Sequence, residues 1–170
     1  YAITPVWKDS SGAALYSSPS SFKWTAPNGT LSGALASGTT YSLQNGTSTI
    51  SEVTWKGSNV TPSSGMTFDA STGSPTKNLR IYAFTMQGKD QSGYNIPSSF
   101  AITFPNATAT TFAGNSTGYY SLSQVQNGSY TLNLIWNALT VNGSLAQSIT
   151  ADKTLSFVGL VYYSATNSYR

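Results

Sequence analysis

The chain of 170 residues contains no cysteine and no histidine. Disulfides are therefore excluded, and so are imidazole general bases, thiolate nucleophiles and the usual zinc ligands. Stability therefore has to come from a packed core. An enzyme built from this chain would have few side chains that could act as a catalytic base or nucleophile. We expect no enzymatic activity, no metal and no cofactor.

Charge is also scarce, because charged residues make up only 8% of the chain. The acidic residues are Asp9, Glu52, Asp69, Asp90 and Asp152. Acid denaturation largely comes from protonating carboxylates that are paired in the native state, so we expect tolerance of acid. A glycosidase would need Glu52 and an aspartate as a carboxylate pair, which no motif marks. The net charge is +3, but the basic residues are scattered, so no nucleic-acid surface is predicted.

No apolar run reaches the roughly 18 residues that a membrane-spanning helix needs. The chain begins at Tyr1 without a basic and apolar leader, which suggests a mature terminus left by signal-peptide cleavage. We therefore expect a protein that is exported and does not span the membrane.

What the chain has in abundance is apolar residues at a period of two. In the segment 130–136, Tyr130, Leu132, Leu134 and Trp136 alternate with other residues, and four Asn-Gly pairs are typical hairpin turns. These patterns predict an all-β fold, an immunoglobulin-like or jelly-roll β-sandwich. We expect one sandwich domain over residues 13–170 behind a tail of residues 1–12. No internal repeat is evident in this pattern.

Seven Asn-X-Ser/Thr sequons are present, where about four would be expected by chance at this composition. They begin at Asn28, Asn45, Asn59, Asn106, Asn115, Asn127 and Asn142. Asn-Gly turns explain part of this excess, but Asn59, Asn106 and Asn115 lie outside such turns. The sequons predict covalent N-glycans on an extracellular protein.

The N-terminal segment, residues 1–12, is a strand followed by a polar, flexible stretch that we expect to act as a hinge. Tyr1, Ile3, Pro5 and Trp7 fall on one face at period two, and Pro5 removes one ladder donor, which suits an edge or inserted strand. Such a strand either folds back as the first strand of its own domain or enters a neighbouring molecule. For the second case we expect an acceptor groove lined by Leu155, Phe157, Val161 and Tyr163.

The segment Tyr1–Trp7, the sequons and the cysteine-free, acid-poor composition together resemble a known family. They are similar to the subunits of the glycosylated thread filaments of thermoacidophilic archaea of the Sulfolobus group. These are pilins joined by donor-strand complementation, with an architecture like that of chaperone–usher pilins. The resemblance implies a cell-surface filament of identical subunits that supports adhesion or biofilm formation, in which each N-terminal strand enters the next subunit.

Two alternatives remain open from the residues. The four tryptophans and eleven tyrosines would also suit a monomeric adhesion or carbohydrate-binding module. Such a module has exposed aromatic side chains and a tail packed on its own domain. A Lys–Asn isopeptide bond is a further hypothesis, with Lys77, Lys153 and Asn137 as candidates.

Overall fold

The structure is a computed structural model that describes residues 1–62, 64–105, 107, 109–141 and 144–159. The fold is all-β, as the alternating pattern predicted, and the described residues contain no α-helix. The chain divides into two compact units, which are described separately. Unit 1 comprises residues 1–82 and 124–127, and unit 2 comprises residues 83–123 and 128–170.

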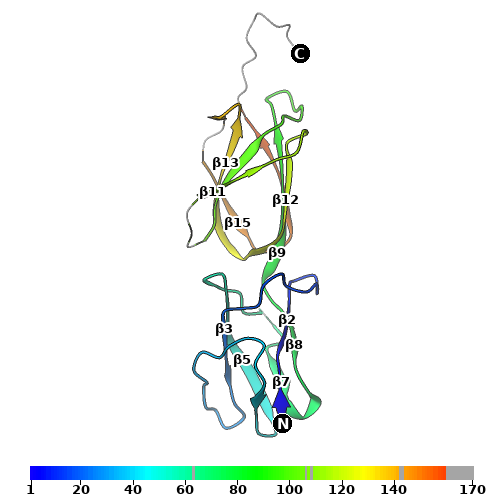
Figure 1. Ribbon diagram of the computed structural model, residues 1–170, viewed down its shortest axis with the longest axis vertical. Helices are drawn as coiled ribbons and strands as arrows, with labels where there is room; N and C mark the ends of the chain where they lie inside the picture. The colour runs from blue at the N-terminus through cyan, green and yellow to red at the C-terminus, as the bar shows by residue number, and fades with distance from the viewer. Residues whose placement is uncertain (63, 106, 108, 142–143, 160–170) are drawn as a thin grey trace, which may run out of the picture. The chain divides into compact units, whose positions relative to one another are not determined.

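Unit 1 has two layers of strands (Figure 1). The strands of the first layer are β1 (Ala2–Ile3), β2 (Val6–Lys8), β4 (Tyr41–Ser42) and β8 (Thr76–Asn78). Those of the second layer are β3 (Ser21–Thr25), β5 (Thr47–Trp55), β6 (Ser58–Asn59) and β7 (Thr67–Asp69). β1 pairs antiparallel with β4, and β2 pairs parallel with β8. A 3-10 turn, η1 (Ala70–Thr72), precedes β8.

The core of unit 1 is aromatic. Alternate residues of β3 point inward, so Phe22 and Trp24 are buried, and Trp7 of the other layer packs on Phe22 with ring centroids 5.2 Å apart. Ile3, Ile50 and other apolar residues complete the same cluster. The two layers are therefore held together by side chains that the period-two pattern places on their inner faces.

Unit 2 has the same kind of layering. The strands of the first sheet are β12 (Tyr119–Gln126), β9 (Ile81–Lys89) and β16 (Lys153–Val158), with β9 in the centre and β16 parallel to it. The strands of the second sheet are β10 (Ser99–Thr103), β11 (Ala109–Ala113), β13 (Gly128–Trp136), β14 (Leu139–Thr140) and β15 (Leu145–Ile149). Phe100 of β10 packs on Phe157 of β16 with ring centroids 5.7 Å apart.

The two units differ from the expected organisation of one sandwich behind a short tail. Residues 1–12 belong to unit 1, and the boundary falls inside β9, between Tyr82 and Ala83. A strand that is apolar on alternate residues gives no sign of where one core ends and the next begins. In the part of the chain that the structure describes, no helix is long and apolar enough to cross a membrane.

Candidate functional site

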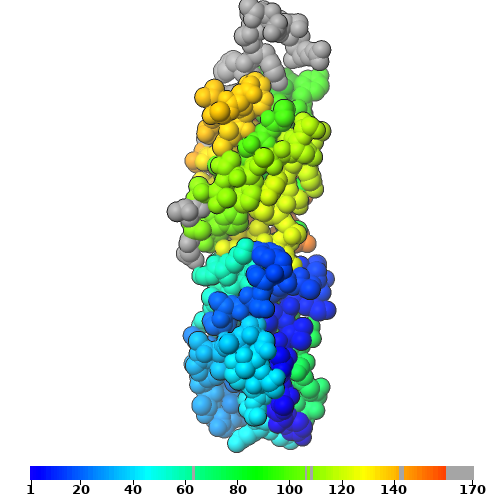
Figure 2. Space-filling model, in the orientation of Figure 1, coloured from blue at the N-terminus to red at the C-terminus, as the bar shows by residue number. Residues whose placement is uncertain are grey.

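The N-terminal strand lies in the middle of a layer of unit 1. β1 contacts β4 on one side, while β2 contacts β8 on the other. Ile3, Pro5 and Trp7 of the predicted donor face are buried in their own unit, whereas Tyr1 is exposed. In Figure 2 the darkest blue atoms, which belong to these first residues, form a strip on the surface of unit 1. We call the space between β4 and β8 that this segment fills the strand slot.

Backbone contacts hold the segment along its length. The Tyr1 ammonium group donates to the Leu43 carbonyl at 2.7 Å, the Thr4 amide donates to Ser74 Oγ at 2.9 Å, and the Val6 amide donates to the Pro75 carbonyl at 2.8 Å. Every one of these partners is a main-chain carbonyl or a small hydroxyl. The pairing therefore depends little on which chain supplies the strand.

The buried end of the segment carries one unsatisfied group. Among the described residues, the indole N–H of Trp7 has no hydrogen-bond acceptor although it is buried. A buried donor left without a partner costs about 1–3 kcal/mol. The Trp7 side chain is therefore held in its unit by packing alone, while its backbone pairs with Lys77 of β8.

A tight turn follows the segment. Asp9 Oδ1 accepts from the amides of Ser11 and Ala13, while its Oδ2 accepts from the Gln124 side-chain amide at 3.1 Å. Burial raises the pKa of the Asp9 carboxyl, but the hydrogen bonds from Ser11, Ala13 and Gln124 outweigh it and hold that pKa below its ordinary value. Gly12 supplies the positive φ of 87° that this turn requires. The polar stretch predicted as a hinge is thus an ordered turn.

The predicted acceptor residues lie partly outside the described residues, because Val161 and Tyr163 are not described. Leu155 is half-buried and Phe157 is buried in unit 2. Both belong to β16, which pairs with β9 and has no other strand partner among the described residues. Of these two residues, the Phe157 ring already packs on Phe100, so only part of Leu155 is available to an incoming strand at this edge.

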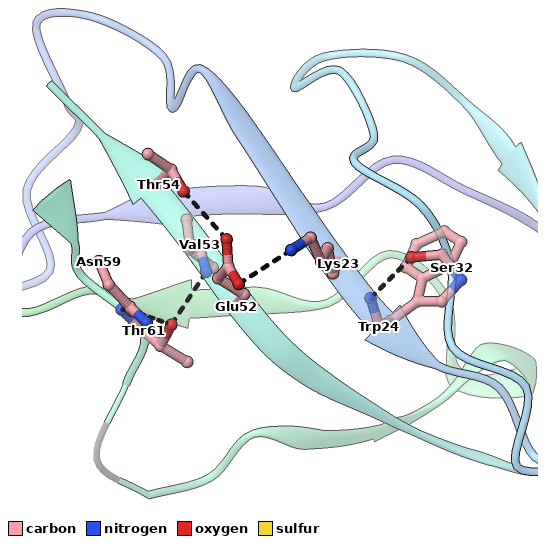
Figure 3. A network of polar contacts seen from close by, with 8 residues as sticks. All are labelled: Lys23, Trp24, Ser32, Glu52, Val53, Thr54, Asn59 and Thr61. Carbon is pink, nitrogen blue, oxygen red and sulfur yellow. Dashed lines mark hydrogen bonds and ion pairs between the residues drawn. The ribbon is translucent and has the colours of Figure 1, made fainter. Parts of the chain in front are cut away.

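The sequons occupy turns and strand ends. Asn28, Asn45, Asn59 and Asn115 are exposed, whereas Asn127 is half-buried, and Asn106 and Asn142 lie outside the described residues. In three of the exposed sequons the asparagine Oδ1 accepts the amide of the hydroxyl residue two positions later. These are Asn28 with Thr30 at 3.1 Å, Asn59 with Thr61 at 2.9 Å (Figure 3) and Asn115 with Thr117 at 3.0 Å. The oxygen is thereby used inside the turn, which leaves the amide nitrogen as the atom for a sugar.

The half-buried Asn127 is different, since its side-chain amide faces the protein. With its nitrogen turned toward them, this amide donates to the carbonyls of Asn59 at 3.1 Å and Arg80 at 3.3 Å. A glycan on the same nitrogen would displace both bonds. The Asn-Gly turn at this sequon does not by itself reveal that burial.

Most of the tryptophans belong to the cores. Trp7, Trp24 and Trp55 are buried and Trp136 is half-buried, so the large exposed aromatic side chains are tyrosines. Among the described residues, the most exposed of these are Tyr1, Tyr16 and Tyr94. A stacking platform for sugars would therefore have to be built from tyrosine rings.

Glu52 forms an ion pair with Lys23 across β3 and β5 at 3.0 Å (Figure 3). This is the sole ion pair among the described residues, so Lys77 and Lys153 have no carboxylate within salt-bridge distance there. Lys77 donates to the carbonyls of Gly65 and Thr67, and burial lowers its pKa. In the described part of the chain no three acidic side chains gather as they would around a metal ion.

Comparison with models of protein families and with curated proteins finds no match for this sequence. Among solved structures, the chain is similar to the TIE protein of Bacillus anthracis, with a TM-score of 0.43 and 12% identity over 94% of this chain and 33% of that one. It is also similar to a streptococcal ancillary pilin, with a TM-score of 0.38 and 11% identity over 93% of this chain and 62% of the other. GBS52, a minor pilin of Streptococcus agalactiae, gives 0.43 and 11% over 100% of both chains.

The chain thus spans about a third of the first of these proteins and about three fifths of the second.

Sequence reasoning identified the N-terminal strand but not the strand slot. β8 lies in a Gly-, Ser- and Pro-rich stretch that is typical of a loop, and β4 has only two residues. Neither strand has an alternating pattern long enough to be recognised.

Proposed function

We propose that the chain is the structural subunit of an extracellular, N-glycosylated filament in which identical copies are joined head to tail by exchange of the N-terminal strand. The filament supports adhesion or biofilm formation. The observation that carries the proposal is the strand slot: the segment before Asp9, with three buried side chains, fills the middle of a layer of unit 1.

Exchange needs no new binding surface, because the slot of one copy fits the strand of another as well as its own. If each copy donates to the next, the arrangement is heterologous and does not close, so it produces a filament. Donating the strand withdraws Ile3 and Trp7 from their own slot and exposes them until a neighbour's slot takes them up, and burying a side chain of this size is worth about 1.5–3 kcal/mol. Each slot is therefore filled either by its own strand or by that of a neighbour.

The edge of β16, with Leu155 and Phe157, remains a second acceptor for the same strand. It would add a strand beside β9 and β16 rather than replace one. Because the Phe157 side chain is already packed, we expect this acceptor to contribute less buried area than the strand slot.

The test is removal of residues 1–8 and addition of a synthetic peptide of residues 1–9. We expect the shortened chain to form no filaments by electron microscopy and to bind the peptide with 1:1 stoichiometry. A matched peptide with Ile3→Asp and Trp7→Asp should not bind. Filaments formed by the shortened chain without peptide would contradict strand exchange.

The monomeric adhesion or carbohydrate-binding module stays as a second candidate, favoured by the first strand packing on its own unit and by the exposed tyrosines. Size-exclusion chromatography at micromolar concentration separates the two. A binding module elutes as a monomer after prolonged incubation, whereas the proposed subunit forms larger species.

A further inference from the structure

The two halves of the chain share a sequence pattern. Residues 1–12 and 82–93 both have Tyr, Ala, Thr, Lys, Asp, Ser and Gly at seven of twelve matched positions. Residues 19–30 and 97–108 share Pro, Ser, Ser, Phe, Thr, Pro, Asn and Thr at eight of twelve. The offsets are 81 and 78 residues, so the second half repeats the first with one short deletion. This corrects the expectation that the chain has no internal repeat.

Strand pairing repeats along with the sequence. Phe22 pairs with Val53 as Phe100 pairs with Leu134, and Thr25 pairs with Thr49 as Thr103 pairs with Thr131. The first strand of each repeat runs parallel to the last, Lys8 beside Asn78 and Lys89 beside Val158. Beyond these pairs, the Leu79 amide donates to the Lys8 carbonyl at 2.8 Å and the Gly159 amide donates to the Lys89 carbonyl at 2.9 Å.

The turns repeat as well. Asp9 and Asp90 begin turns in which their amides donate to the carbonyls of Ala13 and Tyr94, at 3.0 and 2.8 Å. Lys56 and Asn137, which each follow a tryptophan, both have φ of 47°. The chain is thus two copies of one repeat, residues 1–81 and a second that starts at Tyr82.

The contact that joins the repeats lies inside unit 1. The tip of the β12–β13 hairpin, residues 124–127, comes from the second repeat but belongs to unit 1. There the Asn127 amide donates to the Arg80 carbonyl at 3.0 Å, and its side chain donates to the carbonyls of Asn59 and Arg80. The tip is buried, with Val125 exposed by only 1% and Gln126 by 3%.

Each of the two surfaces that meet in this contact has an equivalent in the other repeat, and both equivalents contain exposed residues. In the first repeat, residues 43–46 are the equivalents of residues 125–128; Leu43 is half-buried, and Gln44 and Asn45 are exposed. The turns that receive the tip in unit 1 are residues 9–14 and 56–60, which contact it through Asp9, Ala14 and Asn59. Their equivalents in the second repeat are residues 90–95 and 137–141, which lie at one end of unit 2 (Figure 1). These turns present Tyr94, 66% exposed, and Leu139, 67% exposed, whereas the equivalent of Leu139 in unit 1, Ser58, is buried.

We propose that these two surfaces bind each other in different copies of this chain. The tip 43–46 of one copy docks on the turns 90–95 and 137–141 of the next and reproduces the contact between the repeats. This inference rests on the proposed filament and names the surface that joins its subunits in addition to the exchanged strand. The two surfaces are different, so the contact is heterologous and repeats without closing.

The equivalences specify one bond. Asn127 donates to the Asn59 carbonyl, Asn45 is the equivalent of Asn127, and Thr140 is the equivalent of Asn59. The Asn45 side-chain amide of one copy therefore donates to the Thr140 carbonyl of the next. Asn45 is a sequon, so the contact requires that this nitrogen carry no glycan.

The intermolecular contact is smaller than the internal one. Gln124 accepts from the Tyr16 amide at 3.0 Å and donates to the Ala14 carbonyl at 2.8 Å, but both Gln124 and Tyr16 lie in short insertions that the other repeat lacks. Copies joined by this surface alone would dissociate more readily than the repeats do.

The absence of cysteine allows a direct test. In the full chain, Asn45→Cys with Thr140→Cys should give a ladder of covalent oligomers with a short bis-maleimide, while each single variant should stop at dimers. As a control, Asn127→Cys with Asn59→Cys should cross-link within one chain. Filaments that form but give no ladder, while the control cross-links, overturn the contact and leave the filament intact.

A second measurement uses charge and the native glycans. Leu139→Asp should lower the filament yield at least tenfold without changing the melting temperature, and Thr111→Asp, an exposed change on β11, should leave the yield unchanged. Glycopeptide mass spectrometry of native filaments should find Asn45 unmodified. A glycan on Asn45 in assembled filaments would overturn the contact, whereas a wild-type chain that forms no filaments would refute the proposed function itself.

Discussion

At the scale of single residues, the Trp7 side chain makes one favourable and one unfavourable contribution to the stability of the fold. Its ring is buried against Phe22, but its N–H has no acceptor among the described residues. We expect Trp7→Ala to cost about 3–5 kcal/mol, because it leaves a cavity in the core. Trp7→Phe should cost less than about 2 kcal/mol, since removing the unsatisfied donor offsets part of the lost volume.

Chemical denaturation of the monomer at neutral pH measures both changes. Equal costs for the two variants would show that the indole N–H finds a partner in solution. The same comparison of Trp7→Ala with Trp7→Phe, made on assembled filaments, reports whether the indole N–H of a donated Trp7 finds a hydrogen-bond acceptor in the neighbouring copy.

Asp9 offers a prediction with a defined pH dependence. Its pKa is lowered in the folded state, so its contribution to stability is present above the unfolded pKa of about 3.8 and is lost as pH falls through the lower folded value. Asn115 makes the same turn with a neutral amide, accepting from the amides of Thr117 and Tyr119. We therefore expect Asp9→Asn to cost about 1 kcal/mol at pH 7.

The difference in melting temperature between the parent and Asp9→Asn should shrink as the pH is lowered from 5 to 2. A difference that stays constant over this range would mean that the Asp9 carboxylate contributes nothing through its charge. Thermal melts followed by circular dichroism at several pH values are sufficient.

At the scale of elements, β5 has one residue more than the stretch of β13 that matches it, residues 129–136. Lys23 pairs with Glu52 and Trp24 with Ile50, so Ser51 is the extra residue of a β-bulge, whereas β10 and β13 pair without one. Deleting Ser51 would place Ile50 and Val53 two positions apart, as Leu132 and Leu134 are in β13. We expect the deletion to cost about 1 kcal/mol or less, a change of about 2–4 °C in melting temperature.

Deleting Thr54 from the same strand is the matched control. It turns the buried Trp55 to the other face, because side chains alternate along a strand, and we expect a loss of more than about 3 kcal/mol. Similar melting temperatures for the two deletions would contradict the equivalence of β5 and β13.

At the scale of the whole molecule, the scarcity of acidic groups sets the response to pH. Two carboxyls, Asp9 and Asp69, have lowered pKa values; hydrogen bonds from Ser71 lower that of Asp69. Both contributions are complete above about pH 4 and are lost only below it. We expect the melting temperature to change by less than about 5 °C between pH 7 and pH 4. A fall of more than about 15 °C over that range, measured by calorimetry, would show that other groups are coupled to folding.

The sequence by itself determined the all-β class, the inner faces of the long strands and the alternation of the N-terminal segment. These follow from a period of two, which depends only on neighbouring residues. The repeat is also detectable in the sequence, because residues 19–30 and 97–108 share a pattern. The two halves have diverged elsewhere, so the repeat becomes evident only when the pairing registers of the strands are compared. The tertiary structure alone decided which side chains the slot buries. It also decided that Asn127 is half-buried while Asn45 is exposed. β4, β8 and residue 127 come from distant parts of the chain, and only folding brings them beside the first strand or Arg80.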